Sequence, residues 1–193
     1  MKNEINDMMK ILSFVKETEQ LKNTLRQCWT SEGKQESTAE HTWRLCLMVM
    51  LFEKYLPELN TLRLMKMCLI HDLAEIVDGD IPAIVKVPNK SEKERKNLIF
   101  FIKDLPVHLK DEILNLWDDY ENILSLEAKV AKALDKLETL MQHNIGHNPE
   151  DFNYEFNLTY GKQYTNEIEI LKVVREVVDE ETYQRIEESR RVA

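Results

Sequence analysis

The sequence is poor in the residues that break helices or cross-link small folds. It has only four glycines and five prolines among 193 residues, few for the many tight turns of a protein built mainly from strands. Its three cysteines, Cys28, Cys46 and Cys68, are widely spaced and form no CxxC pair. This spacing argues against a disulfide framework or a zinc knuckle. We therefore expect apolar thiols in a reducing compartment.

Long apolar runs and an excess of positive charge are also lacking. No apolar run approaches the ~18 residues of a membrane span, and the polar N-terminal stretch MKNEINDMMK does not resemble a signal peptide. The formal net charge of −9 argues against nucleic-acid polymers and acidic membranes as partners. We expect a cytoplasmic protein. A small anionic substrate is compatible with this charge, because a pocket can supply its own cations.

Apolar residues instead recur at helical spacing along nearly the whole chain. Predicted helices run from Ile5 to about Leu21, His41 to about Tyr55, about Thr61 to Gly79, Ser91 to about Asp104, Pro106 to Tyr120, Ser125 to about His143, and Thr165 to near the C-terminus. Capping-box spacing occurs at Ser37 with Glu40 and at Ser91 with Glu94. The pattern predicts one all-α domain over residues 1–193.

One stretch, CLIHDLAEIVDGDIP at residues 68–82, places His71, Asp72 and Glu75 in an otherwise apolar run. On a helix, His71 and Glu75 share a face, and Asp72 lies three residues before Glu75. A buried ionisable group is costly unless something compensates its charge. The stretch therefore predicts either a hydrogen-bonded polar patch in the core or a bound cation.

Two other predicted helices carry a similar polar intrusion. His41 lies in EHTWRLCLMVML, and Asp135 lies within the apolar series of VAKALDKLETL. With His71 and Asp72 they would supply two imidazoles and two carboxylates, a mixed set that suits Mn, Co, Fe, Ni or Zn. Two other interpretations stay open: a hydrogen-bonded His–Asp pair in the core, and an ion pair of Asp135 with a neighbouring lysine on a solvated face.

The order H…HD…D is the signature of the HD superfamily of metal-dependent phosphohydrolases, which this sequence resembles. Three longer stretches are similar to segments of its 5′-deoxynucleotidase, or HD domain-containing protein 2-like, branch: LKNTLRQCW, ESTAEHTWR and HDLAEIVDGDIP. The resemblance extends from about Leu21 to Asp135. It implies an all-α HD-domain helical bundle, with a metal-site core at about residues 21–145 and a C-terminal helical region, residues 146–193, packed on it.

The resemblance also implies roles for individual residues. One divalent ion (Mn, Co, Fe, Ni, Zn or Mg) would be held by His41, His71, Asp72 and Asp135. Two residues are implied to be catalytic: Glu75 matches the acidic residue proposed to handle protons, and Asp80 matches the second carboxylate of the pocket, near the sugar and the attacking water. Arg26 and Trp29 match the basic and aromatic residues that line the nucleotide site. The relatives imply a homodimer.

The implied reaction is hydrolysis of a deoxyribonucleoside 5′-monophosphate to a deoxynucleoside and phosphate. The departing 5′ oxygen needs a proton, which Glu75 can supply only if its pKa is raised towards neutrality. Two alternatives remain. The chain could be another HD phosphohydrolase, acting on guanosine tetraphosphate or a nucleotide phosphodiester, or a non-catalytic HD protein that binds a nucleotide.

Two of these residues also have simpler interpretations. Glu75 could hydrogen-bond a metal-binding histidine instead of moving a proton. Arg26 could form a surface ion pair with Glu19 or Glu32.

The other candidate aromatic residues and histidines are not assigned to the site. Trp43 is expected to pack in the core. His143 and His147 are expected in a polar surface cluster where their helix frays, and His108 is expected to be exposed.

Overall fold

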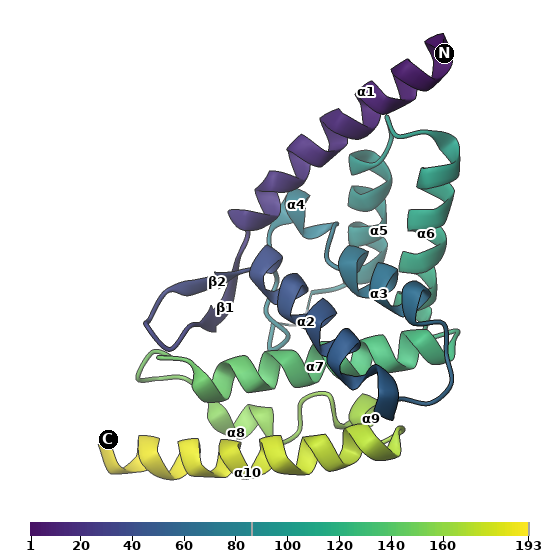
Figure 1. The fold of residues 1–193 in the computed structure, drawn as a ribbon. Helices are drawn as coiled ribbons and strands as arrows, with labels where there is room; N and C mark the ends of the chain where they lie inside the picture. Colours follow the sequence, from purple (N-terminus) through teal and green to yellow (C-terminus); the bar gives the residue numbers. More distant parts are fainter. Residues whose placement is uncertain (86, 193) are drawn as a thin grey trace.

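The elements of this protein are almost all helices, arranged around one long helix (Figure 1). The computed structural model describes residues 1–85 and 87–192. In chain order the elements are α1 (Lys2–Glu17), η1 (Thr18–Lys22), β1 (Leu25–Trp29), β2 (Gln35–Ser37), α2 (Thr38–Phe52), η2 (Glu53–Tyr55), α3 (Thr61–Ile70), α4 (Glu75–Asp78), α5 (Lys90–Phe101), α6 (Val107–Asn122), α7 (Leu126–Ile145), α8 (Tyr154–Asn157), α9 (Lys162–Thr165) and α10 (Glu169–Val192). The all-α prediction is confirmed, with one short hairpin added.

Helix α7 runs through the middle of the molecule and is buried around most of its circumference. Ser125 caps its N-terminus, because its side chain accepts a hydrogen bond from the backbone N–H of Ala128. The helix packs against α2, α3 and α6, and α10 runs alongside it below in Figure 1. A polar side chain on α7 therefore meets other helices rather than solvent.

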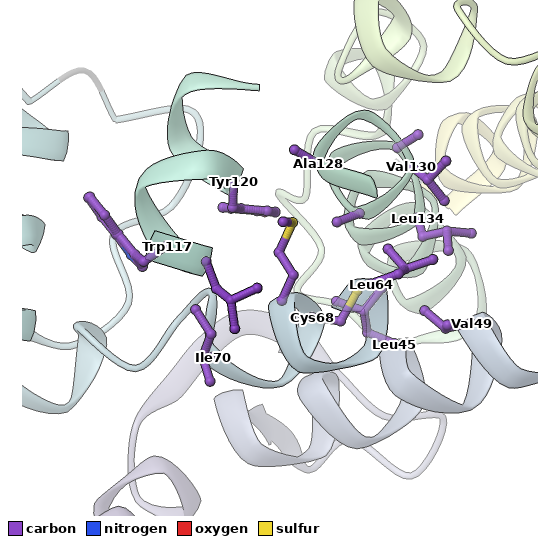
Figure 2. Close-up of a cluster of buried hydrophobic side chains, with 14 of the residues drawn as sticks. Leu45, Val49, Leu64, Cys68, Ile70, Trp117, Tyr120, Ala128, Val130 and Leu134 are labelled. Atoms are coloured by element: carbon purple, nitrogen blue, oxygen red, sulfur yellow. The ribbon is translucent and has the colours of Figure 1, made fainter. Parts of the chain in front are cut away.

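The hydrophobic core joins α2, α3, α6 and α7 (Figure 2). Leu45 from α2, Leu64 and Cys68 from α3, and Leu134 from α7 are fully buried in it, and Trp117 from α6 is nearly so. Burial of one large apolar side chain stabilises the folded state by ~1.5–3 kcal/mol. This cluster therefore holds together the helices that carry the candidate site.

Strands β1 and β2 form an antiparallel hairpin that the helical pattern did not predict. Leu25 pairs with Ser37, and Trp29 pairs with Gln35. Alternate residues of β1 are buried, but one of the two buried side chains is an arginine, Arg26. Hydrophobic alternation is therefore too weak to reveal so short a strand from sequence.

The single helix predicted up to Gly79 is divided in two. Helix α3 ends just before His71, and α4 begins at Glu75. Between them the backbone forms i→i+3 hydrogen bonds, which tighten the turns. Neighbouring side chains on a regular α-helix do not face each other. The tightened segment instead brings His71 and Asp72 side by side, with Nε2 and Oδ2 3.0 Å apart.

The two predicted capping boxes have different outcomes. At α2, the Ser37 side chain accepts from the backbone N–H of Glu40, and the Glu40 carboxylate accepts from the backbone N–H of Ser37. The box predicted at Ser91 is wrong, because α5 already starts at Lys90, after Asn89 in the left-handed conformation with φ +55°. Within the described residues, no helix combines the length and hydropathy that a bilayer crossing requires.

Candidate active site

Four side chains from different parts of the chain meet at one point. His41 lies in α2, His71 and Asp72 lie in the turn after α3, and Asp135 lies in α7. Nε2 of His41 lies 3.4 Å from Oδ1 of Asp135 and 3.8 Å from Oδ2 of Asp72. Nε2 of His71 lies 3.0 Å from Oδ2 of Asp72 and 3.9 Å from Oδ1 of Asp135. The structure thus brings together all four residues predicted to bind a metal.

Both histidines direct Nε2 to this point and use Nδ1 for a hydrogen bond elsewhere. Nδ1 of His41 contacts the carboxylate of Glu138, and Nδ1–H of His71 donates to the carbonyl oxygen of Cys68 at 2.8 Å. Within the part of the chain that the structure describes, the two buried Nε2 atoms have no hydrogen-bond partner. An imidazole with Nδ1–H engaged and Nε2 free is in the state that binds a metal. The donor set therefore fits a divalent cation.

The electrostatic surroundings of His41 are dominated by negative charge. Burial and the charge of Arg26 lower the pKa of His41, but Glu138 and Asp135 outweigh them and raise this pKa to about 9. The pKa of a fully buried imidazole rises only where carboxylates dominate its surroundings. The site therefore favours additional positive charge, which a divalent ion would supply.

Asp135 has two kinds of partner. Lys136 Nζ lies 2.7 Å from Oδ2 of Asp135, and the Tyr120 hydroxyl donates to the same oxygen at 2.7 Å. Burial raises the pKa of Asp135, but Lys136 and the two histidines outweigh it and hold this pKa well below its usual value. A lysine pair is therefore present, but the solvated face expected for it is wrong, because Asp135 is buried. Oδ1 of Asp135 still faces the two histidines.

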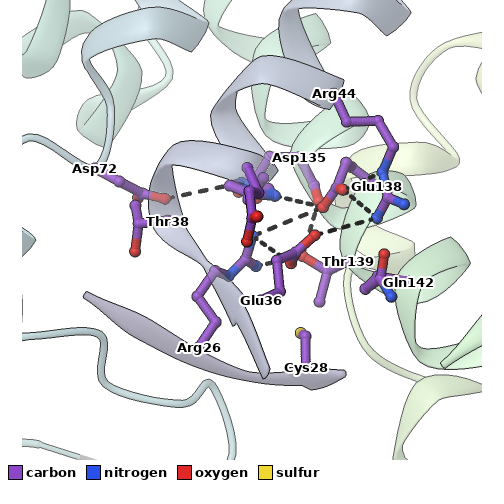
Figure 3. Close-up of polar contacts among 12 residues, drawn as sticks. Arg26, Cys28, Glu36, Thr38, Arg44, Asp72, Asp135, Glu138, Thr139 and Gln142 are labelled. Carbon is purple, nitrogen blue, oxygen red and sulfur yellow. Dashed lines mark hydrogen bonds and ion pairs between the residues drawn. The ribbon is translucent and has the colours of Figure 1, made fainter. Parts of the chain in front are cut away.

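A second group of buried charges contacts His41 through Glu138, and Figure 3 shows Arg26, Glu36, Arg44 and Glu138 of this group. Glu138 accepts a hydrogen bond from Nε of Arg44 at 2.6 Å. Nη1 of Arg26 lies 3.6 Å from Glu36 and 3.7 Å from Glu138. Glu36, His41 and Glu138 also have the spacing of a metal-binding group. However, two guanidinium groups already supply positive charge there, so this cluster serves to orient His41.

A cavity of about 560 Å³, within the size range of ligand pockets, is lined by three of the four residues, His71, Asp72 and Asp135. All the other residues predicted for the site line it, together with three lysines. The relevant lining residues are Arg26, Trp29, His71, Asp72, Glu75, Asp80, Lys90, Lys132, Asp135 and Lys136. Arg26 and the three lysines stand beside several carboxylates in this lining, and they are the groups to which an anionic ligand could bind.

Glu75 is a neutral acid at the wall of this cavity. Burial raises its pKa to about 10, helped by the charges of Asp72 and Asp80. Oε2 of Glu75 accepts a hydrogen bond from the Thr38 hydroxyl at 2.9 Å. Both metal-site histidines have Nδ1 occupied by other groups. Glu75 therefore does not orient a histidine, and it retains a proton that it can donate at neutral pH.

Arg26 is buried in the protein, so the predicted surface ion pair is wrong. Its Nη2 donates to Oγ1 of Thr139 at 3.0 Å, and its ion pairs are with Glu36 and Glu138. Its partners come from β2 and α7 rather than from the adjacent surface. The guanidinium therefore lies between the buried carboxylates and the cavity.

The two tryptophans of the N-terminal half have different environments. Trp29 is half-buried and lines the cavity. Trp43 is 66% exposed, so its predicted core position is wrong.

The end of α7 lies directly against the backbone of β1 at Gly146. A Cβ on Gly146 would lie 2.3 Å from the carbonyl oxygen of Trp29. Only glycine lets the end of α7 approach the backbone of β1 this closely.

His143 is buried, which contradicts its predicted surface location. Its Nε2 lies 3.2 Å from Sγ of Cys28, and its Nδ1–H donates to Oδ1 of Asn157 at 3.0 Å. Burial lowers the pKa of His143 to about 4, so the ring is neutral. The prediction failed because α7 continues to Ile145 instead of fraying at this position. His147 is exposed.

Several residues of the site were not predicted from the sequence. Glu138 holds His41, and Lys132 and Lys136 line the cavity. Lys132 lies three and four positions before Asp135 and Lys136, and Glu138 lies three positions after Asp135, so these residues share one face of α7. A polar stripe at that spacing is the signal that could have revealed them.

The fold is that of the HD domain family. The HD domain family model matches residues 18–175, and the chain belongs to this family.

Individual relatives are similar over most of the chain. The chain is 31% identical to the Homo sapiens 5′-deoxynucleotidase HDDC2 over 175 residues, which covers 86% of this chain and 84% of that protein. It is 37% identical to the Danio rerio 5′-deoxynucleotidase HDDC2 over 145 residues, which covers 70% and 68% of the two chains. The fold is similar to that of a predicted metal-dependent phosphohydrolase from Magnetospirillum magnetotacticum MS-1, with a TM-score of 0.82, 28% identity and coverage of 93% and 94%.

Proposed function

We propose that this protein is a metal-dependent 5′-deoxynucleotidase, which hydrolyses deoxyribonucleoside 5′-monophosphates to deoxynucleosides and phosphate. The observation that carries the proposal is the convergence of two imidazoles and two carboxylates beside a cavity of nucleotide size. Similarity to the human and zebrafish 5′-deoxynucleotidases supports the choice of substrate.

Four residues would hold one divalent ion: His41, His71, Asp72 and Asp135. Mixed nitrogen and oxygen donors accept Mn, Co, Fe, Ni, Zn or Mg, so the donor set leaves the identity of the ion open. When bound, such an ion lowers the pKa of its water and polarises a phosphoryl oxygen. The contribution of the chain is to orient the donors, through the contacts of the two histidines with Glu138 and the Cys68 carbonyl.

Glu75 would donate a proton to the departing 5′ oxygen. A carboxyl group acts as a general acid only if it is still protonated at the working pH. Burial and the charges of Asp72 and Asp80 keep Glu75 in that state. Asp80 therefore acts through Glu75, because its charge makes loss of that proton unfavourable.

The cations of the cavity would bind the phosphate, and Trp29 would contact the sugar. Arg26 can present a planar guanidinium to phosphate oxygens. Lys132 and Lys136 add two ammonium groups, each also paired with a carboxylate, Glu121 and Asp135. The half-buried indole of Trp29 would crowd a 2′ hydroxyl and so favour deoxyribose.

We also propose that residues 1–193 form one HD domain that assembles as a homodimer in the cytoplasm. Helix α1 projects from the body in Figure 1 and supports the dimer, because it carries five apolar side chains that are each more than half exposed. These are Ile5, Met8, Met9, Leu12 and Val15. Sedimentation equilibrium tests the dimer, and a single unfolding transition tests the single domain.

The function is tested by a substrate screen on protein of known metal content. Purified protein is analysed for metals and assayed for phosphate release from deoxy- and ribonucleoside monophosphates with added Mn, Co or Mg. We expect a deoxynucleotide preference of at least about tenfold. Turnover of guanosine tetraphosphate or cyclic dinucleotides in place of monophosphates would favour the other HD phosphohydrolases.

A pair of aspartate variants then tests the site itself. Asp72→Ala should lose both the bound metal and phosphate release. The matched control is Asp78→Ala, because Asp78 is exposed and its carboxylate contacts Asn97 and Lys93 instead of the cavity. If Asp72→Ala keeps full turnover, the proposed site is wrong.

A further inference from the structure

The outer wall of the cavity is aromatic and comes from the connection between α7 and α10. Phe152, Phe156 and Tyr160 line the same cavity as His71 and Asp135. The three rings are half-buried, so part of each remains available to a ligand. We call these three residues the aromatic wall. The sequence resemblance ends at Asp135 and assigns them no role.

A continuous series of contacts leads from the metal-binding point to the aromatic wall. Asp135 pairs with Lys136 at 2.7 Å. Lys136 Nζ lies 5.3 Å from the centroid of the Tyr160 ring. The rings of Tyr160 and Phe156 are stacked with their centroids 5.2 Å apart. This series of contacts therefore connects Phe156 to Asp135 through Tyr160 and Lys136.

The wall is anchored from behind by a buried arginine of α10. Arg175 is 1% exposed. Its Nη1 donates to the carbonyl oxygen of Tyr160 and its Nη2 to that of Asn157, each at 2.6 Å. Gly161 has a φ of +73° and lies directly against Lys136. If residue 161 had a side chain, its Cβ would lie 2.6 Å from Cβ of Lys136, so only glycine lets the backbone pass this close. The wall is thus held at a set distance from α7.

The other end of the wall is tied to the strand that carries Arg26 and Trp29. Phe152 packs edge-on against the His143 ring, with centroids 4.8 Å apart. His143 bridges Cys28 of β1 and Asn157 of α8. The aromatic wall and β1 are therefore two sides of one cavity, connected through a neutral buried imidazole.

We propose that the aromatic wall receives the nucleobase of the substrate, with Phe156 and Phe152 as the stacking residues and Arg175 as a positioning residue. This inference rests on the proposed function, because it assumes that the phosphate lies at the metal-binding point. A base has an apolar face that stacks on aromatic rings whatever its hydrogen-bonding edge. The side chains of Ile81 and Pro82 line the same cavity and add apolar surface.

The test compares a substrate that has a base with one that lacks it. Phe156→Ala is assayed on deoxyadenosine 5′-monophosphate and on 2-deoxyribose 5-phosphate. We expect kcat/KM for the nucleotide to fall about tenfold, mainly through KM, because stacking on an aromatic residue is worth ~1–3 kcal/mol per base. For the sugar phosphate, kcat/KM should change less than about twofold.

Two further variants keep this comparison decisive. Phe156→Leu retains apolar volume but removes the aromatic face, and it should show the same selective loss if the alanine variant folds poorly. Phe100→Ala is the matched control, because Phe100 is 62% exposed on α5 and does not line the cavity. Equal losses on both substrates, or an unchanged nucleotide KM, would overturn the inference.

A binding measurement separates this inference from the proposed function. Deoxyadenosine, the product without phosphate, is titrated calorimetrically into wild-type protein and Phe156→Ala. We expect about tenfold weaker binding to the variant. If wild-type protein releases no phosphate from either substrate, the proposed function fails, and this titration still decides whether the aromatic wall binds the base. Equal affinities would reject the wall.

Discussion

Nε2 of His41 lies 3.4 Å from Oδ1 of Asp135, although the two residues belong to different helices, α2 and α7, that are far apart in the sequence. Neither helix has solvent at this position, because both pack in the core. An imidazole and a carboxylate brought together in this way lose their hydration and must be compensated by other charges or by an ion. The consequences can be tested at individual residues.

Glu138→Gln should weaken metal binding without removing a proposed ligand. Glu138 contacts Nδ1 of His41 and pairs with Arg26 and Arg44. Partners of this kind typically contribute 10- to 100-fold to metal affinity, so we expect a loss in about that range. Competition of the metal-free protein with a fluorescent chelator measures it. The control is Glu176→Gln, because Glu176 is exposed on α10. An unchanged metal affinity in Glu138→Gln would show that the contact between Glu138 and Nδ1 of His41 does not position the imidazole.

Glu75→Gln should separate metal content from rate. The variant should bind as much metal as wild type, because Glu75 makes its hydrogen bond to Thr38. Its kcat should fall by about 100-fold or more if Glu75 is the general acid. Elemental analysis and initial rates on one preparation measure both quantities, and unchanged kinetics would remove Glu75 from the mechanism.

The same substitution should alter how stability depends on pH in the metal-free protein. The pKa of Glu75 is raised from 4.5 to about 10, first by burial. Between these values the unfolded chain releases a proton that the folded protein keeps, so this group lowers stability as the pH rises through that window. Glu75→Gln should therefore match wild type near pH 4 and exceed it by roughly 5 kcal/mol at pH 8, because each pH unit above 4.5 costs the wild type about 1.4 kcal/mol. Urea unfolding with a chelator present tests this, and a difference that is constant with pH would contradict it.

Gly146→Ala should disturb Trp29 from the opposite side of the cavity wall. The added Cβ would lie 2.3 Å from the carbonyl oxygen of Trp29, so β1 and α7 must separate. Overpacking of this kind costs about 1–3 kcal/mol, and KM for deoxynucleotides should rise with it. The control is Gly33→Ala. Its added Cβ would meet no atom within 4 Å, although alanine is strained at the backbone φ of +79° that residue 33 adopts. A rise in KM for Gly33→Ala as large as that for Gly146→Ala would contradict the role of this close approach.

Helical periodicity predicted most elements well, and the failures have local causes. The β1–β2 hairpin was missed because Arg26 occupies one of its buried positions. The predicted continuous helix through His71 was wrong because tightened turns interrupt it after Ile70. The interruption after Ile70 contains no glycine or proline that would announce it, whereas the hairpin turn contains Gly33 with φ +79°.

Some residues of the site could be predicted from the sequence, and others could not. The four residues could be chosen from sequence because their order, H…HD…D, resembles the HD superfamily signature. Their position as polar residues in apolar runs alone left a hydrogen-bonded pair in the core open. The roles of Glu138 and His143 could not be predicted, because one contacts a helix 97 positions away and the other a strand 115 positions away. Trp43 was misplaced because a tryptophan does not reveal which face of its helix is covered.

The sequence by itself determined the helical class of this protein, most of its helix boundaries and the residues able to bind an ion, because periodicity, capping and side-chain chemistry are properties of short stretches. Only the tertiary structure decided that those residues meet, that Glu75 is buried enough to keep a proton, and that an aromatic wall from the C-terminal third closes the cavity. Each of these depends on how distant helices pack, and therefore on distances and burial that no local pattern contains.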